Sequence, residues 1–165
     1  IKMVEEMSQE SGSDEGETPV EVTTSPKGVT IGISSDISFE SGSATTKQGF
    51  LDILKKIVPT IQESYFMIAV EGHTDSDPLP KALREKYPSN WELSGARAAA
   101  VVRLLIGLEV DPTRLQSVGY GEFVPRDKTT AEIITTDLIQ KYNSTPQQKS
   151  RNRRVEITFL APNKL

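Results

Sequence analysis

The sequence contains no cysteine and a single histidine, His73. The absence of cysteine excludes disulfides, thiolate metal sites and thiol catalysis, and it is compatible with an extracytoplasmic location. No run of about 18 apolar residues is present, so the sequence predicts no membrane span of its own. The 165 residues are enough for one globular domain with a hydrophobic core, and a second full domain is not expected.

Acidic residues are concentrated at the start of the chain. Residues 1–28 contain seven acidic and two basic side chains, whereas the rest is close to neutral. Residues 8–26 are rich in Ser, Glu, Gly and Thr and poor in large apolar residues, so burial cannot repay the entropy cost of ordering them. We therefore expect residues 1–28 to be an acidic flexible linker that follows a membrane anchor, residues 29–160 to form the domain, and residues 161–165 to be a tail.

Beyond the linker, apolar periodicity predicts strands that alternate with helices. Val29, Ile31 and Ile33 lie on one face of the first predicted strand. Three further runs of apolar and β-branched residues predict strands at 65–72, 114–120 and 153–159.

Three helices are predicted between these strands. The first begins after Thr45 and is expected to end near Pro59. The second is opened by the capping box S-x-x-E at Ser89 and ends near Gly107, and a short third helix is predicted within 129–142. The order β-α-β-α-β-(α)-β, with right-handed connections, predicts an α/β two-layer sandwich in which helices cover a small mixed sheet.

One charged residue lies in the apolar stripe of the second predicted helix. Arg97 falls among Leu93, Ala100 and Val101 at about 100° per residue. An unpaired guanidinium against a core is costly, so Arg97 either pairs with a structural carboxylate or carbonyl or binds an anion. Asp75, just beyond the second strand, is the candidate carboxylate in the same cleft. An acid and a base held close without neutralising each other match a zwitterionic ligand.

Other chemistry has weaker support. His73 and Asp75 point the same way on an extended stretch but lack a third metal ligand in the sequence, so no metal or cofactor is expected. No G-x-S-x-G elbow accompanies His73, which we interpret as a structural residue ending the strand, and Asp77 is assigned to a solvated insert. The basic run at 151–154 lacks interleaved aromatic residues in a nearly neutral domain, so nucleic-acid binding is not expected.

Four blocks of the sequence resemble, in order and spacing, the signature blocks of the OmpA-like C-terminal domain, a peptidoglycan-binding module. They are EGHTD, NWELSGARAAAVV, RLQSVGYGEFVP and NRRVEI, and the match covers about residues 29–160. Within this superfamily the chain is most similar to the B subunit of the flagellar stator, the MotB type. FESGSA before the first helix and the insert SDPLPKALREKYP carry this closer resemblance.

The resemblance implies a binding site. It places the aspartate of H-T-D and the arginine of L-S-x-x-R-A, here Asp75 and Arg97, on the ammonium and the carboxylate of the diamino acid in the peptidoglycan stem peptide. Further candidates in the same blocks are Thr74, Asn90, Arg153 and Arg154. On a strand, neighbouring side chains face opposite sides, so at most one of the two arginines serves a given site.

The implied function is non-catalytic: the domain anchors a flagellar stator complex to the cell wall. The resemblance also implies a homodimer, an A-type membrane subunit as partner, and a periplasmic location in a protein anchored in the inner membrane. Two alternatives remain open at this point. One is a Pal-type or porin-type wall anchor unrelated to motility, and the other is a wall hydrolase.

Overall fold

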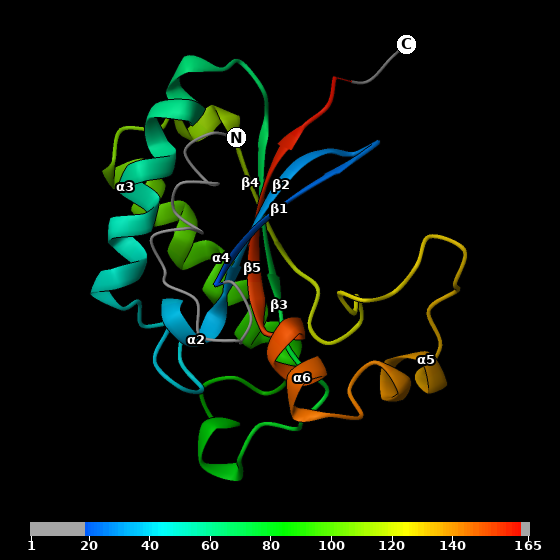
Figure 1. The fold of residues 1–165 in the computed structure, drawn as a ribbon. Helices are drawn as coiled ribbons and strands as arrows, with labels where there is room; N and C mark the ends of the chain where they lie inside the picture. Colours follow the sequence, from blue (N-terminus) through cyan, green and yellow to red (C-terminus); the bar gives the residue numbers. More distant parts are fainter. Residues whose placement is uncertain (1–18, 163–165) are drawn as a thin grey trace.

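The computed structural model describes residues 19–162. Five strands form one mixed sheet in the order β1-β2-β5-β3-β4 (Figure 1). The pair β3 and β4 is parallel, and the other neighbours are antiparallel. The predicted α/β class with a small mixed sheet is confirmed. The strands are β1 (Val20–Ser25), β2 (Gly28–Ser34), β3 (Ile68–His73), β4 (Leu115–Gly119) and β5 (Arg154–Leu160).

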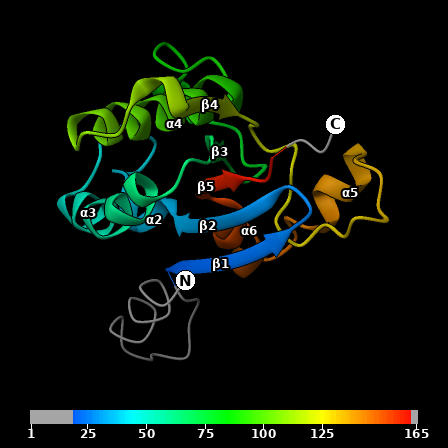
Figure 2. The same cartoon turned by 90° about the horizontal axis from the view of Figure 1, so that it is seen from above.

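Helices α3 and α4 cover one face of the sheet, as the view along the layers shows (Figure 2). Their apolar stripes and the facing strand residues form the core, in which Phe50, Leu54, Val70 and Ile157 are fully buried. No helix within residues 19–162 is long and apolar enough to cross a membrane. The α-helices are α2 (Ser35–Ser38), α3 (Gln48–Glu63), α4 (Asn90–Gly107), α5 (Thr136–Lys141) and α6 (Pro146–Asn152), and two 3-10 turns span Lys81–Leu83 and Pro112–Arg114.

Helix α4 begins where the sequence predicted. The Ser89 side chain accepts a hydrogen bond from the backbone N–H of Trp91, which satisfies one of the free donors of the first turn. Glycines allow the helix to lie unusually close to the sheet. A Cβ on Gly72 would lie 2.2 Å from the carbonyl oxygen of Ser94, and one on Gly119 would lie 2.5 Å from the backbone nitrogen of Gly95. Close helix packing at this end therefore requires glycine on both strands.

The predicted linker boundary at residue 28 is wrong, because β1 lies within it. Val20–Ser25 pairs antiparallel with β2, and Val20 is 3% exposed opposite Ile33. The segment alternates Val20 and Val22 with polar residues, a strand pattern that the acidic composition of 8–26 concealed. The ordered domain therefore includes β1, while residues 1–18 lie outside the described part of the chain.

Helix α3 does not end at Pro59, as the sequence suggested, but continues to Glu63. Proline inside a helix removes one hydrogen bond and costs about 3 kcal/mol. Val58 and Ile61 on either side of it are buried, 6% and 0% exposed, and continue the apolar stripe of the helix. Burial of the two side chains, at about 1.5–3 kcal/mol each, offsets the loss.

The helix predicted within 129–142 is shorter than expected. It forms only α5, Thr136–Lys141, capped by the side chain of Thr135, and Ile133 before it is 82% exposed. A second helix that the sequence did not predict, α6, follows and leads directly into β5. The segment after β4, including α5, lies away from the layer of α3 and α4 (Figure 1).

Candidate functional site

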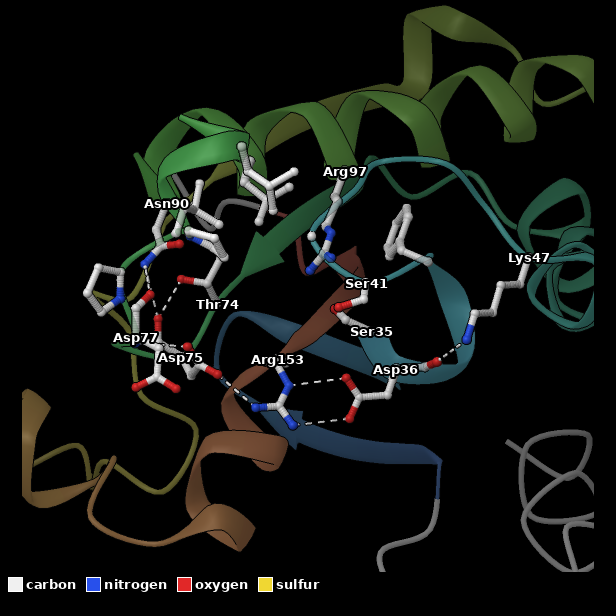
Figure 3. Close-up of a pocket in the computed structure, with 17 residues that line it drawn as sticks. Ser35, Asp36, Ser41, Lys47, Thr74, Asp75, Asp77, Asn90, Arg97 and Arg153 are labelled. Carbon is white, nitrogen blue, oxygen red and sulfur yellow. Dashed lines mark hydrogen bonds and ion pairs between the residues drawn. The ribbon is translucent and has the colours of Figure 1, made fainter. Parts of the chain in front are cut away.

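A cleft of about 600 Å³ opens at the end of the sheet where β3 ends and β5 begins (Figure 3). Its walls are α2 with the loop after it, the insert that follows β3, and the first half of α4. Five of the six candidate residues from the sequence line it: Thr74, Asp75, Asn90, Arg97 and Arg153. Residues that lie far apart in the chain are thus brought to one edge of the sheet.

Arg97 enters the cleft from α4 and is only 6% exposed. Its Nε donates to the carbonyl oxygen of Ser43 at 2.8 Å, and its guanidinium carbon lies 5.0 Å from the centre of the Phe39 ring. Burial is the main influence on the pKa of Arg97 and lowers it. Within the described residues the terminal nitrogens Nη1 and Nη2 have no hydrogen-bond partner, so both can receive an anion.

Asp75 lies across the cleft from Arg97 and is 8% exposed. Its Oδ1 accepts the backbone N–H of Asp77 at 2.9 Å, and its Oδ2 accepts Nη1 of Arg153 at 2.7 Å. Its ion pair within the described residues is with Arg153 and not with Arg97. The predicted arrangement, an acid and a base in one cleft that do not neutralise each other, is therefore present.

Arg153 connects two carboxylates. Besides Asp75, it donates to Asp36 through Nε at 3.1 Å and Nη2 at 3.2 Å. Burial alone would lower the pKa of Arg153, but the contacts with Asp36 and Asp75 outweigh it and raise the pKa. The guanidinium thus stays charged and fixes the position of the Asp75 carboxylate.

Thr74 and Asn90 hold the turn that carries Asp75. The hydroxyl of Thr74 donates to the carbonyl oxygen of Asp75 at 2.8 Å, and the amide of Asn90 donates to the carbonyl oxygen of Asp77 at 3.1 Å. The backbone N–H of Thr74 donates to the carbonyl oxygen of Gly121 at 2.8 Å. Both side chains are buried, which leaves the carboxylate of Asp75 with little freedom to turn away from the cleft.

Arg154 does not line the cleft, although the sequence made it a candidate together with Arg153. It is 4% exposed and donates to Glu156 at 3.2 Å and to the carbonyl oxygen of Val124 at 3.1 Å. Arg153 has an extended backbone and directly precedes β5, so the alternation of side chains that continues along the strand turns Arg153 and Arg154 to opposite faces. Arg154 is therefore a structural arginine on the other side of the sheet.

Sequence patterns did not reveal Asp36 or the apolar wall formed by Leu79 and Leu83 of the insert. Asp36 lies two residues beyond the end of β2, and polar residues just beyond a strand end are a recognisable signal of a site at a sheet edge. No comparable signal marked the two leucines, because only the folded insert brings them into the cleft that Arg97 lines. Asp77 is 58% exposed at its side chain and pairs with Lys149 at 3.1 Å, as expected for a solvated insert.

Residues 38–153 match the model of the OmpA family, so the chain belongs to the OmpA family. This confirms the family resemblance inferred from the four sequence blocks.

Curated relatives and solved structures show which proteins of this family the chain is similar to. Motility protein B of Bacillus subtilis is 30% identical over 146 residues, covering 87% of this chain and 49% of the relative. The chain thus spans about half the length of the curated relatives it matches. Among solved structures, the cell wall anchor of the T6SS from Pseudomonas aeruginosa has a TM-score of 0.75 at 27% identity, covering 98% of this chain and 96% of that one. The periplasmic domain of Helicobacter pylori MotB has a TM-score of 0.71 at 26% identity, covering 92% and 87%.

Proposed function

We propose that this domain binds peptidoglycan without cleaving it, by gripping the diamino acid of the stem peptide. The observation that carries the proposal is the guanidinium of Arg97, whose two terminal nitrogens have no partner in the described part of the chain, facing the fixed carboxylate of Asp75 across one cleft. A free ammonium and carboxylate on one ligand match these two groups. The similarity to a cell wall anchor and to motility protein B supports a cell-wall ligand.

The ligand ammonium has to share Asp75 with Arg153 or displace it. Displacement leaves Arg153 held by its two hydrogen bonds to Asp36, so no guanidinium is left without a counter-charge. The ligand carboxylate forms a bidentate pair with Nη1 and Nη2 of Arg97, the geometry for which arginine is best suited. Both contacts form in a partly dehydrated cleft. An exposed ion pair contributes about 0.2–1 kcal/mol, and each of these two contacts therefore stabilises the complex by more than that.

We further propose that the domain anchors the stator complex of a flagellar motor to the wall. In this arrangement the domain is periplasmic and homodimeric, its chain is anchored in the inner membrane, and an A-type membrane subunit is its partner. Many tethered copies on a polymeric wall hold a large load even if each site is weak, because tethering raises the effective concentration.

A wall anchor unrelated to motility is the second candidate, because the T6SS anchor resembles the whole of this domain. The two candidates predict different membrane partners. Purification of the full-length protein from its native membrane should recover an A-type stator subunit if the motor assignment is right. Recovery of secretion-system or outer-membrane components instead would contradict it and support the second candidate.

Replacing Asp75 by asparagine should weaken binding to purified peptidoglycan sacculi about 10- to 100-fold, because a hydrogen bond to a charged group contributes about 1.5–3 kcal/mol. Cosedimentation of the domain with sacculi measures this loss. Asp52→Asn, an exposed position on α3, is the matched control and should bind like wild type. Undiminished binding by Asp75→Asn would contradict the proposed site, and release of soluble muropeptides by the wild-type domain would identify a hydrolase instead.

A further inference from the structure

Two carboxylates oppose each other in the middle of the sheet, independently of the cleft. Glu71 on β3 and Glu156 on β5 are direct cross-strand partners. Their side chains are only 5% and 18% exposed. Like charges at such positions destabilise a sheet, and burial adds to the cost. A fold that keeps this pair needs positive charge between or around the carboxylates.

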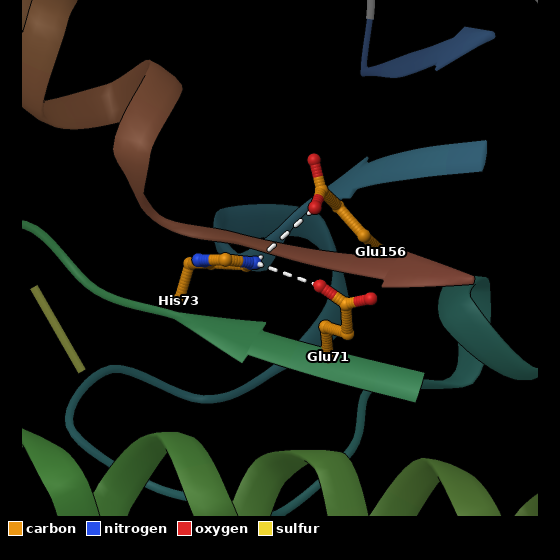
Figure 4. Close-up of side chains that lie close together, drawn as sticks. All are labelled: Glu71, His73 and Glu156. Atoms are coloured by element: carbon orange, nitrogen blue, oxygen red, sulfur yellow. Dashed lines mark ion pairs between the residues drawn. The ribbon is translucent and has the colours of Figure 1, made fainter. Parts of the chain in front are cut away.

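Among residues 19–162, lysine and arginine side chains contact only one oxygen of each carboxylate. Lys27 contacts Oε1 of Glu71, and Arg154 contacts Oε1 of Glu156 at 3.2 Å. Arg126 lies 3.8 Å from the same Oε1 of Glu156. The second oxygens, Oε2 of both residues, turn toward the ring of His73 (Figure 4).

His73 is buried without a hydrogen-bond partner. Its side chain is 1% exposed, and within the described residues neither Nδ1 nor Nε2 makes a hydrogen bond. Tyr120 stacks on the ring with centroids 5.2 Å apart, which fixes the ring plane. Nε2 points between the two carboxylates, 3.8 Å from Oε2 of Glu71 and 3.2 Å from Oε2 of Glu156 (Figure 4). Buried polar atoms in proteins almost always have a partner, so a buried nitrogen without a hydrogen bond indicates a site for a bound ion or another ligand.

The spacing of these atoms suits a metal ion. Ligand atoms about 2.1 Å from a tetrahedral zinc ion are about 3.4 Å from one another. The two distances from Nε2 bracket this value, and the candidate ligand atoms of the three residues all lie within 4.8 Å of one another. Imidazole combined with carboxylates is a donor set used for zinc and related transition metals.

We propose that Glu71, His73 and Glu156 bind one divalent transition-metal ion between β3 and β5. The sequence predicts no metal site, because His73 has no third ligand nearby in the chain, but β5 supplies Glu156 from a position far along the sequence. Because the Gly72 side of β3 faces α4, the site lies on the opposite face of the sheet. The ion joins the two strands at the end that carries Asp75 and Arg153, and offsets the repulsion between the carboxylates.

The test is titration of the untagged domain with Zn²⁺ and, separately, Co²⁺ by isothermal calorimetry and NMR. The chain has one histidine, so a single pair of imidazole nitrogens reports on the site. We expect saturable binding of one ion, a shift of the Nε2 resonance of His73, and a rise in Tm of about 5–10 °C at a hundredfold excess over Kd.

Glu156→Gln and His73→Gln should each lower the metal affinity at least tenfold, whereas Glu63→Gln, an exposed glutamate of α3, should leave it unchanged. Absence of saturable binding to the folded wild-type domain at millimolar Zn²⁺ would overturn the proposal, and this result does not depend on whether the variants fold. Binding that is equally tight in all variants would also overturn it, because the ion would then sit elsewhere. A doubly protonated His73 ring that ignores added metal would show that the cluster is an internal ion pair.

Discussion

Replacing Arg97 by alanine is expected to abolish detectable binding of the domain to peptidoglycan sacculi. The substitution removes both free guanidinium nitrogens from the cleft, and each hydrogen bond to a charged group contributes about 1.5–3 kcal/mol. The combined loss of about 3–6 kcal/mol corresponds to a roughly 150- to 25,000-fold weaker complex. Cosedimentation measures the loss directly, and calorimetry with a soluble muropeptide that carries the diamino acid gives the affinity.

Two further variants separate charge from geometry. Arg97→Lys retains the positive charge but lacks the planar fork, so it should recover only part of the affinity. Arg103→Ala, an exposed arginine on the same helix, should bind like wild type. Because Arg97 also donates to the carbonyl oxygen of Ser43, circular dichroism must show that the variant is folded. A folded Arg97→Ala protein that binds normally would rule out the proposed carboxylate contact.

Replacing Gly72 by alanine is expected to destabilise the fold by about 3 kcal/mol, through overpacking against α4. The added Cβ would lie 2.2 Å from the carbonyl oxygen of Ser94, a backbone atom that cannot move alone. Helix α4 must therefore shift away from β3. For a domain of this size a loss of about 3 kcal/mol lowers Tm by about 6–12 °C, which calorimetry or a thermal melt followed by circular dichroism measures.

Gly95→Ala is the matched control for this prediction. Gly95 lies in α4 next to the same contact, but a Cβ there meets no atom within 4 Å. Alanine is about 1 kcal/mol more favourable than glycine inside a helix, so this variant should be as stable as wild type or more so. Equal melting temperatures for Gly72→Ala and wild type would show that the helix can move at no cost.

The elements with a clear apolar period were predictable, because one face of each packs on the core. The stripe of α4 and the alternation in β2 and β5 are examples, and Ser89 marked the start of α4 correctly. Local signals failed where packing outweighed them. Pro59 normally ends a helix, but the buried Ile61 beyond it continues the core contact.

The acidic run before residue 28 indicated a linker, although β1 is stabilised by pairing with β2, which composition does not report. The residues of the cleft likewise include some that the sequence identified and some that only the structure brought together. Arg97 was identified from the sequence because a guanidinium inside an apolar stripe is costly to bury without a partner. Asp75 was identified because it follows the strand that α4 packs against. Asp36 gains its role only through Arg153, by an ion pair between residues more than 100 positions apart, and Arg153 gains its role by joining Asp36 to Asp75.

The sequence by itself determined the class of fold, the family, and two of the charged residues that line the cleft, Asp75 and Arg97. It did so because periodicity and out-of-place charges are local properties of the chain. Only the tertiary structure decided which arginine of the pair Arg153 and Arg154 reaches the cleft, and which groups surround His73. The register of β5 against β2 and β3 settles both, because a shift of one residue would exchange the two faces of that strand.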